Sequence, residues 1–150
     1  MIRLTKLTDY GIVLLTNMAK DPERVMHNAR DLAAEAGIPL PMTSKILKAL
    51  ARVGLLVSHR GVKGGYSLAR EPEAITVAQI IGALEGPIAI TECTDAESDC
   101  QVEASCPVRS NWHRINDAVL QALEGITLAE MTQPFRPALV RLESLLTQRH

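Results

Sequence analysis

The sequence predicts a mainly α-helical fold that carries one β-hairpin, because three patterns follow one another along its 150 residues. Apolar residues recur at helical spacing in three segments of the first half, and a glycine-rich segment with strand-like alternation comes directly after them. A long segment with a heptad-like apolar seam occupies the second half. Apolar residues make up 47% of the chain and charged residues 22%, which is typical of a globular protein rather than a disordered one.

Three short helices are predicted in the first half. Apolar residues that recur three and four positions apart predict the first helix, over about residues 4–20. Asn28 can cap a second helix and Gly37 can end it. Pro41 fits the first turn of a third helix, because its missing N–H has no intrahelical partner there, and Gly54 can stop that helix. The residues of the third helix predicted to face inward are Met42, Ile46, Leu50 and Val53.

A β-hairpin is predicted directly after these helices. Leu56, Ser58 and Arg60 alternate with Leu55, Val57 and His59, which we interpret as a strand signal, and "YSLA" is typical of the returning strand. Gly61, Gly64 and Gly65 supply the backbone freedom that the turn needs. The order helix, helix, turn, helix, hairpin is that of a winged helix-turn-helix, which we assign to residues 1–75.

Residues 76–150 are predicted to hold a loop, over about 88–106, and a helical dimerisation region. Thr76 and Gln79 form a capping-box pattern for a short helix, and Ser105 can cap the long helix that follows the loop. A terminal helix is predicted over 137–148. The long helix can bury its seam against a second copy or, alternatively, inside its own domain. The seam residues are Val108, Trp112, Ile115, Val119, Ala122 and Ile126.

Charge is divided unevenly along the chain although the net charge is only −1. Residues 1–70 hold eleven Lys or Arg against five Asp or Glu, whereas residues 71–107 hold eight acidic residues and no Lys or Arg. This segregation favours a polyanion, here double-stranded DNA, as the partner of the first half. Chance segregation of solvated charge is the alternative.

The candidate DNA-binding residues lie on the third helix and on the hairpin. Short hydroxyls and lysines near a helix N-terminus suit base edges and phosphates in a major groove, and a glycine-flanked cationic hairpin tip can approach a DNA backbone or minor groove. An ordinary solvated helix face is the alternative. The candidates are Thr43, Ser44, Lys45 and Lys48 on the helix, and Arg60, Lys63 and Gly64 on the hairpin. Lys6 and Arg30 are further candidates for phosphate contacts.

All three cysteines lie in one acidic stretch, with the spacing C-x6-C-x5-C. The stretch contains no C-x-x-C pair, so a thioredoxin-like motif or a zinc ribbon fits poorly. Thiolates select iron–sulfur clusters, zinc or copper(I). A cluster or metal site, a thiol–disulfide sensor and plain reduced thiols all remain open on spacing alone.

Other classes of function have little support in the sequence. Residues 1–11 have no long apolar run and no segment reaches eighteen consecutive apolar residues, so we expect a cytoplasmic protein with no membrane partner. We find no nucleophile elbow, phosphate-binding loop or dinucleotide fingerprint, so we expect no enzymatic activity. An iron–sulfur carrier needs cysteines but no DNA-binding surface, and the cationic helix and hairpin argue against it.

The chain resembles the IscR/NsrR family of winged-helix iron–sulfur regulators over nearly its whole length. The matching pieces are the opening "MIRLTKLTDYGIVLL", the segment from "LAAEAGIPLP" through the "RG-x-x-GGY" hairpin, and the cysteine trio before a long helix. The opening looks most like the branch that regulates SUF iron–sulfur assembly. The resemblance implies a homodimer on a palindromic operator that represses cluster-assembly genes according to cluster occupancy. A thiol-, redox- or nitric-oxide-responsive repressor is the alternative.

The resemblance also implies a set of ligands. Two departures bear on it: the interval between the first two cysteines is one residue longer than usual, and Arg109 stands where IscR-type members have a histidine. The NsrR-like ligand set is therefore implied, with an aspartate of the first helix of the other subunit, although an exposed helix charge or a local cap is the alternative for this aspartate. His113 is a weaker candidate. A [4Fe–4S] cluster is favoured and [2Fe–2S] is the alternative. The implied ligands are Cys93, Cys100, Cys106 and Asp9 of the partner subunit.

Overall fold

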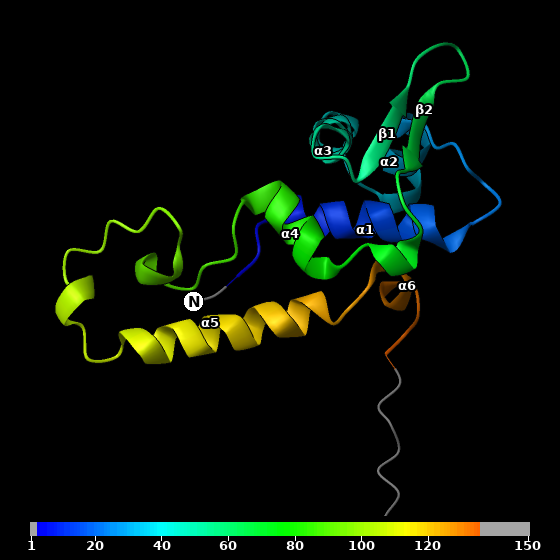
Figure 1. Cartoon of the computed structure of the whole chain (residues 1–150). Helices are drawn as coiled ribbons and strands as arrows, with labels where there is room; N and C mark the ends of the chain where they lie inside the picture. Colours follow the sequence, from blue (N-terminus) through cyan, green and yellow to red (C-terminus); the bar gives the residue numbers. More distant parts are fainter. Residues whose placement is uncertain (1–2, 136–150) are drawn as a thin grey trace, which may run out of the picture.

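The structure, a computed structural model, describes residues 3–135. Figure 1 shows α1 to α4 and the hairpin gathered at one end, while α5 extends away from them and the loop that precedes it lies at the far end. The predicted terminal helix over 137–148 lies outside the described residues. In chain order the elements are α1 (Lys6–Lys20), α2 (Ala29–Ala36), α3 (Leu40–Arg52), β1 (Leu56–His59), β2 (Gly65–Leu68), η1 (Pro72–Ala74), α4 (Val77–Glu85), η2 (Glu92–Thr94), η3 (Glu103–Ser105), α5 (Arg109–Glu124) and α6 (Leu128–Met131).

Most helix ends follow from local sequence. The Asn28 side chain accepts a hydrogen bond from the Asp31 N–H at 2.8 Å, which satisfies a backbone donor at the start of α2. Gly37 ends α2 with a φ of 65°, in the left-handed region where glycine is favoured. Thr76 and Gln79 form both hydrogen bonds of a capping box at α4. These three predictions are confirmed.

The start of α5 differs from the prediction. Ser105 closes the short turn η3 instead of capping the helix, and its hydroxyl donates to the Val102 carbonyl at 3.4 Å. The helix begins at Arg109, with no side-chain cap at Val108. The prediction that Ser105 caps α5 is wrong, because one more turn of chain separates the last cysteine from the helix.

The hairpin forms a two-stranded wing that is anchored at its root. β1 and β2 pair antiparallel, with Leu56 opposite Leu68. Along the other edge of β2, His27 and Tyr66 exchange two backbone hydrogen bonds, at 2.9 and 2.7 Å. The segment between α1 and α2 therefore holds the wing against the helical body.

His27 is a buried titratable side chain at the wing root. Its side chain is buried and its Nδ1 has no hydrogen-bond partner among the described residues. Burial, and then the neighbouring Arg24 guanidinium, lower the pKa of His27 below its ordinary 6.5. The backbone carbonyl of Arg24 and the carboxylates of Glu35 and Asp21 oppose this shift without reversing it. The folded state therefore favours the neutral imidazole.

We expect the contribution of neutral His27 to the free energy of unfolding to be fully present above about pH 6.5. This contribution is lost as the pH falls through the lowered pKa of the folded state. The reason is that the unfolded chain binds the proton more readily than the folded chain does. Melting temperatures recorded from about pH 7.5 to about pH 5 should fall more steeply for the wild type than for His27→Gln, which cannot titrate. Parallel curves for the two proteins would contradict this role of His27.

The core is aliphatic and lies between α1, α3 and α4. Burying one such Leu, Ile or Met side chain typically contributes about 1.5–3 kcal/mol to folding.

Val53, predicted to face inward, is exposed because the chain leaves helical geometry at that residue, so this prediction is wrong. Met42 is half-buried and packs against the core. The fully buried apolar side chains are Leu14, Leu15, Met18, Leu32, Ile46, Leu47, Leu50, Leu56, Ile75, Ile80 and Leu128.

The chain returns to this core after α5. Leu128, at the start of α6, is fully buried in the same cluster as Ile75, and its N–H donates to the Ile75 carbonyl at 2.8 Å. The C-terminal end of α5 is therefore tied to the helical body through α6, while its N-terminal end lies at the loop, away from that body (Figure 1). No helix among residues 3–135 is both long and apolar enough to cross a membrane.

Candidate DNA interface and cysteine loop

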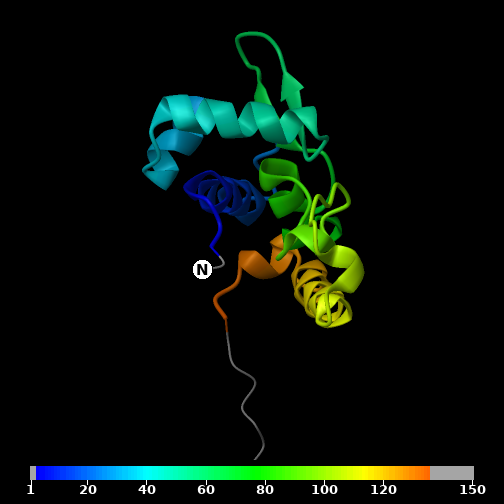
Figure 2. The same ribbon diagram turned by 90° about the vertical axis from the view of Figure 1, so that its left-hand side faces the viewer.

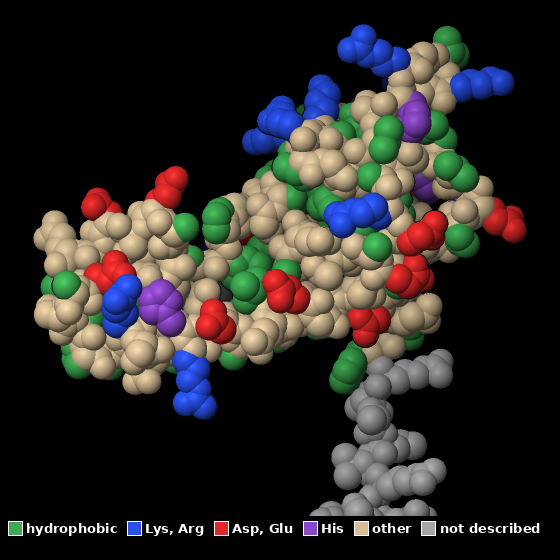
Figure 3. All heavy atoms as spheres, viewed as in Figure 1, with side chains coloured by type: hydrophobic (Ala, Val, Ile, Leu, Met, Phe, Trp, Pro, Cys, Tyr) green, Lys and Arg blue, Asp and Glu red, His purple; other side chains and the backbone are tan. Residues whose placement is uncertain are grey.

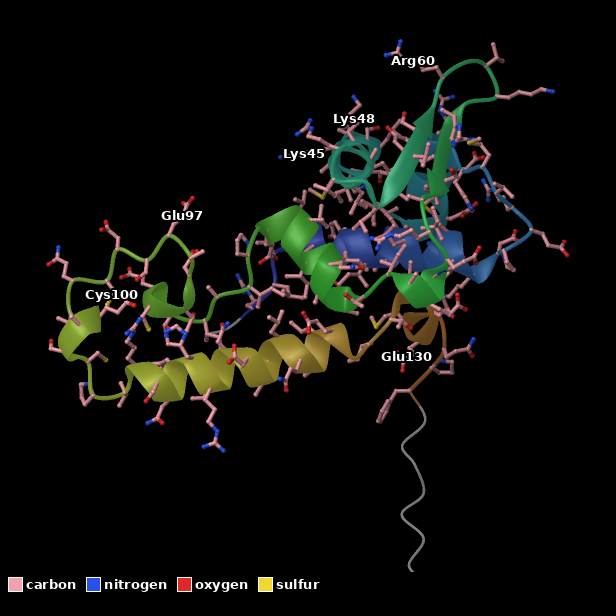
Figure 4. The ribbon with its side chains drawn as sticks, viewed as in Figure 1. Lys45, Lys48, Arg60, Glu97, Cys100 and Glu130 are labelled. Carbon is pink, nitrogen blue, oxygen red and sulfur yellow. The ribbon has the colours of Figure 1, made fainter. Side chains whose placement is uncertain are left out.

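The third helix presents a cationic face to solvent. Lys45 and Lys48 are exposed one turn apart on α3, and Ser44 is half-buried beside them. Figure 4 shows Lys45 and Lys48 pointing outward on the same side of the molecule as Arg60 of the wing. Figure 2 places α3 and the wing at the end of the molecule opposite α6. These exposed cations of the helix and the wing form what we call the cationic surface.

Thr43 does not belong to this surface. Its side chain is fully buried, and its Oγ1 has no hydrogen-bond partner among the described residues. The prediction that Thr43 contacts DNA is wrong, because Thr43 lies three and four residues before Ile46 and Leu47, on the stripe of α3 that faces the core. Polarity suggests an outward side chain, but helical periodicity places it inward.

The wing tip is a tight turn that brings two cations forward. Arg60 and Lys63 are exposed on either side of it. The N–H of Gly64 donates to the Gly61 carbonyl at 3.0 Å and closes the turn. A Cβ at Gly64 would collide with the backbone of His59 and Gly61, so this position requires glycine. Gly64 therefore shapes the tip, and its place among the DNA contacts remains a prediction.

The cations of this surface are not compensated by ion pairs within the described part of the chain. Among residues 3–135, Lys45, Lys48, Arg60 and Lys63 form no ion pair, and the pairs present involve Arg24 and Arg109. Figure 3 shows Lys and Arg side chains gathered over α3 and the wing tip, and acidic side chains around the loop before α5. Unpaired cations on one face are the electrostatic footprint of a polyanion-binding surface.

The three cysteines are free thiols in the loop between α4 and α5. Cys93 is buried within η2, where the Thr91 hydroxyl lies 3.2 Å from its sulfur. Cys100 and Cys106 are half-buried. Figure 4 shows Cys100 on the inner side of the loop and Glu97 on the outer side.

Two side chains of α5, Asn116 and Arg109, fasten this loop to the helix, and no sequence pattern indicates either of them. Asn116 is buried in α5; its Oδ1 accepts from the Ile90 N–H at 3.0 Å and its Nδ2 donates to the Ile88 carbonyl at 3.4 Å. Arg109 pairs with Glu103 at 2.7 Å. The Ser98 hydroxyl, and then Arg109, hold the pKa of Glu103 below its ordinary value. Asn116 thus holds the first half of the loop and Arg109 the second.

The donor set fits an iron–sulfur cluster by its chemistry, since three free thiols in one loop are the soft ligands that iron–sulfur centres use. Among the described residues, however, no three His, Cys, Asp or Glu side chains lie close enough together to hold one metal ion. Asp9 is exposed in the first turn of α1 and is not grouped with the cysteines within this subunit.

Two other side chains near the loop bear on a fourth ligand. Arg109, which stands where IscR-type members have a histidine, is occupied by its ion pair with Glu103. His113 is half-buried on α5, and its Nε2 has no hydrogen-bond partner among residues 3–135. The whole ligand set, the three cysteines included, remains a prediction.

The apolar seam of α5 is left uncovered by residues 3–135. Its valines, isoleucines and tryptophan are between 36% and 45% exposed. The face of α5 that meets the loop and α4 is a different stripe, about a quarter turn away, and contains Asn116. Packing within the described residues therefore does not explain why apolar residues line this exposed stripe of α5.

A three-helix unit with a wing and an exposed cationic third helix defines the winged helix-turn-helix class of DNA-binding proteins. A family model described as "Rrf2: Iron-dependent Transcriptional regulator" matches residues 4–134. The chain therefore belongs to the Rrf2 family and is a DNA-binding transcriptional regulator. The expectation that it is not an enzyme is confirmed by this membership.

Named relatives support the same family. The transcriptional regulator NsrR of Shouchella clausii is 28% identical over 131 residues, which cover 87% of this chain and 88% of NsrR. The structure of CymR, the global cysteine regulator of B. subtilis, is 30% identical with a TM-score of 0.70, and the match covers 88% of this chain and 97% of CymR. IscR of T. potens is 28% identical with a TM-score of 0.65, covering 87% and 85% of the two chains.

These comparisons confirm the predicted mainly helical fold with a two-stranded wing. They also confirm the resemblance to IscR and NsrR at the level of the family.

Proposed function

We propose that this regulator is a dimeric repressor that binds a palindromic operator and changes its DNA affinity with the occupancy of an iron–sulfur cluster in the cysteine loop. The observation that carries the proposal is a trio of free cysteines in a loop fastened to α5, within a chain that also carries an unpaired cationic winged helix. Genes of iron–sulfur cluster assembly are the proposed targets, because the opening "RLTKLTDYGIVLL" resembles the SUF-regulating branch.

On DNA, α3 is proposed to enter the major groove while the wing contacts the adjacent backbone or minor groove. Lys45, Lys48, Arg60 and Lys63 are exposed and unpaired among the described residues, so they can neutralise phosphates. Ser44 lies near the start of α3, where a short hydroxyl can reach a base edge. These contacts are supported by the shared direction of the cations in Figure 4.

The dimer is proposed to form through the seam of α5. Apolar residues spaced by three and four positions can interdigitate with the same residues of a second copy, as in a coiled coil. The seam lies beside the stripe that holds the loop, so pairing through it leaves the loop contacts of Asn116 intact. A two-fold dimer presents two α3 helices to the two halves of a palindrome.

In the proposed cluster site, Cys93, Cys100 and Cys106 ligate iron, and Asp9 of the partner subunit completes the set. Asp9 is exposed in α1, so a second subunit has access to it. A [4Fe–4S] cluster, when bound, supplies an iron centre whose loss reports the iron, oxygen or nitric oxide status of the cell. A ligand from α1 would link the cluster to the DNA-binding unit, because α1 packs directly against α3.

A repressor that responds through its thiols alone is the second candidate. It is favoured by the free state of all three cysteines and by the lack of a grouped metal site among the described residues. Oxidation at one or more cysteines would then replace cluster loss as the signal.

Single Cys→Ser replacements at positions 93, 100 and 106 are expected to remove most of the iron and acid-labile sulfide. Wild-type protein purified without oxygen should contain about four iron atoms per subunit, and each variant less than about a tenth of that, because each lacks one thiolate ligand. Ser105→Ala, in the same loop but without a thiolate, is the matched control and should match the wild type.

The two candidates give different results in this experiment. A wild-type protein that stays free of iron after anaerobic reconstitution, but whose DNA affinity changes on oxidation, would exclude the cluster and support the thiol sensor. Variants that keep the wild-type iron content would show that the cysteines are not the ligands.

A further inference from the structure

The tip of the wing carries an apolar side chain that the fold does not use. Val62 lies between Gly61 and Lys63 and is completely exposed to solvent. Figure 3 shows a hydrophobic side chain at the tip of the wing between two cationic ones. A valine in this position contributes nothing to the packing of its own subunit.

The turn that presents Val62 is narrowly constrained. Gly61 has a φ of 109°, which non-glycine residues rarely adopt, and the N–H of Gly64 closes the turn on the Gly61 carbonyl at 3.0 Å. The backbone at Gly64 has no room for a Cβ. Val62 is therefore held in one place at the front of the wing, which lowers the entropy cost of its contact with a partner.

The surroundings of Val62 are cationic. Arg60 and Lys63 flank it and form no ion pair among the described residues. On the side toward α2, Val62 and Lys63 line an open hollow of about 620 Å³ together with Arg30 and Asn28. The acidic residue of this hollow, Asp31, is paired with Arg24 at 3.2 Å. An apolar contact framed by free cations matches DNA, whose sugars are apolar and whose phosphates are anionic.

We propose that Val62 enters the minor groove of DNA and packs against the deoxyribose walls, with Arg60 and Lys63 on the flanking phosphates. This inference rests on the proposed placement of α3 and the wing on DNA. Burial of the Val62 side chain then contributes binding energy that does not depend on counterion release. Lys63, in contrast, contributes through counterion release.

The test compares Val62→Ser with Lys63→Gln on the duplex that the wild-type protein selects from a random-sequence library. Val62→Ser is expected to weaken binding roughly 5- to 20-fold at every salt concentration, with the slope of log affinity against log salt unchanged. Lys63→Gln is expected to reduce the magnitude of that slope by about 0.9. Val62→Ile should bind like the wild type, because it keeps the apolar contact.

Val25→Ser is the matched control, since Val25 is 70% exposed but lies on the turn between α1 and α2 rather than at the wing tip. Its affinity should equal that of the wild type. Binding of Val62→Ser within twofold of the wild type, or a change in its salt slope, would overturn the minor-groove contact and leave the proposed function standing. Failure of the wild type to select any duplex would instead overturn the proposed function.

Discussion

Replacing Lys45 and Lys48 together by glutamine is expected to lower the affinity for DNA about 30-fold at about 0.15 M salt. Both lysines are exposed on α3 and form no ion pair among the described residues, so each can neutralise one phosphate. Removal of one phosphate-neutralising lysine should reduce the slope of log affinity against log salt by about 0.9 in magnitude, and removal of both by about 1.8. Fluorescence anisotropy over a salt series measures both the affinity and the slope.

The matched control replaces Lys20 and Arg114 by glutamine, which removes the same charge from α1 and α5 instead of α3. This variant should keep the wild-type slope, because neither residue is placed on the DNA-facing surface. Equal decreases of affinity in the two double variants would show that net charge, and not the face of α3, determines the affinity.

Replacing Ile115 by aspartate is expected to dissociate the proposed dimer. Ile115 is 45% exposed at the middle of the α5 seam, and in a paired seam the new carboxylate would be buried opposite its own copy. The mass in solution should fall from twice 16.3 kDa to 16.3 kDa. Affinity for the palindromic duplex should fall at least about 100-fold, because the two half-sites are no longer bound by one molecule.

Gln121→Asp is the control for this variant, since Gln121 is exposed on the side of α5 away from the seam. It introduces the same charge into the same helix and should leave the dimer intact. Light scattering measures the masses. A dimer that survives Ile115→Asp would exclude the seam as its interface.

The elements that the sequence predicts best are those set by neighbouring residues. The cap at Asn28, the stop at Gly37 and the capping box at Thr76 each depend on groups within four residues along the chain. The hairpin likewise follows from the glycine-rich turn between its two short strands. The prediction for Thr43 is wrong because it follows polarity alone, although the spacing to Leu47 places Thr43 on the buried stripe.

The remaining features depend on contacts between distant residues. Asn116 reaches 26 residues back to Ile90, and nothing about an asparagine in a charged helix indicates that it is buried. The backbone bridge between His27 and Tyr66 uses no side-chain signal at all. For the cysteines, the sequence indicates the soft donor set, but the described residues hold no group of three metal-ligating side chains, so binding of a metal stays a prediction.

The most direct test of the proposed coupling between cluster and DNA binding is to measure the DNA affinity of one protein sample before and after its cluster is removed. The sample is purified without oxygen, its iron and sulfide are counted, and both forms are titrated onto the duplex that the wild-type protein selects. The proposed coupling between cluster and operator predicts affinities that differ by about tenfold or more between the two forms. Affinities that agree within twofold, in a sample whose cluster content has been counted before and after, would contradict it.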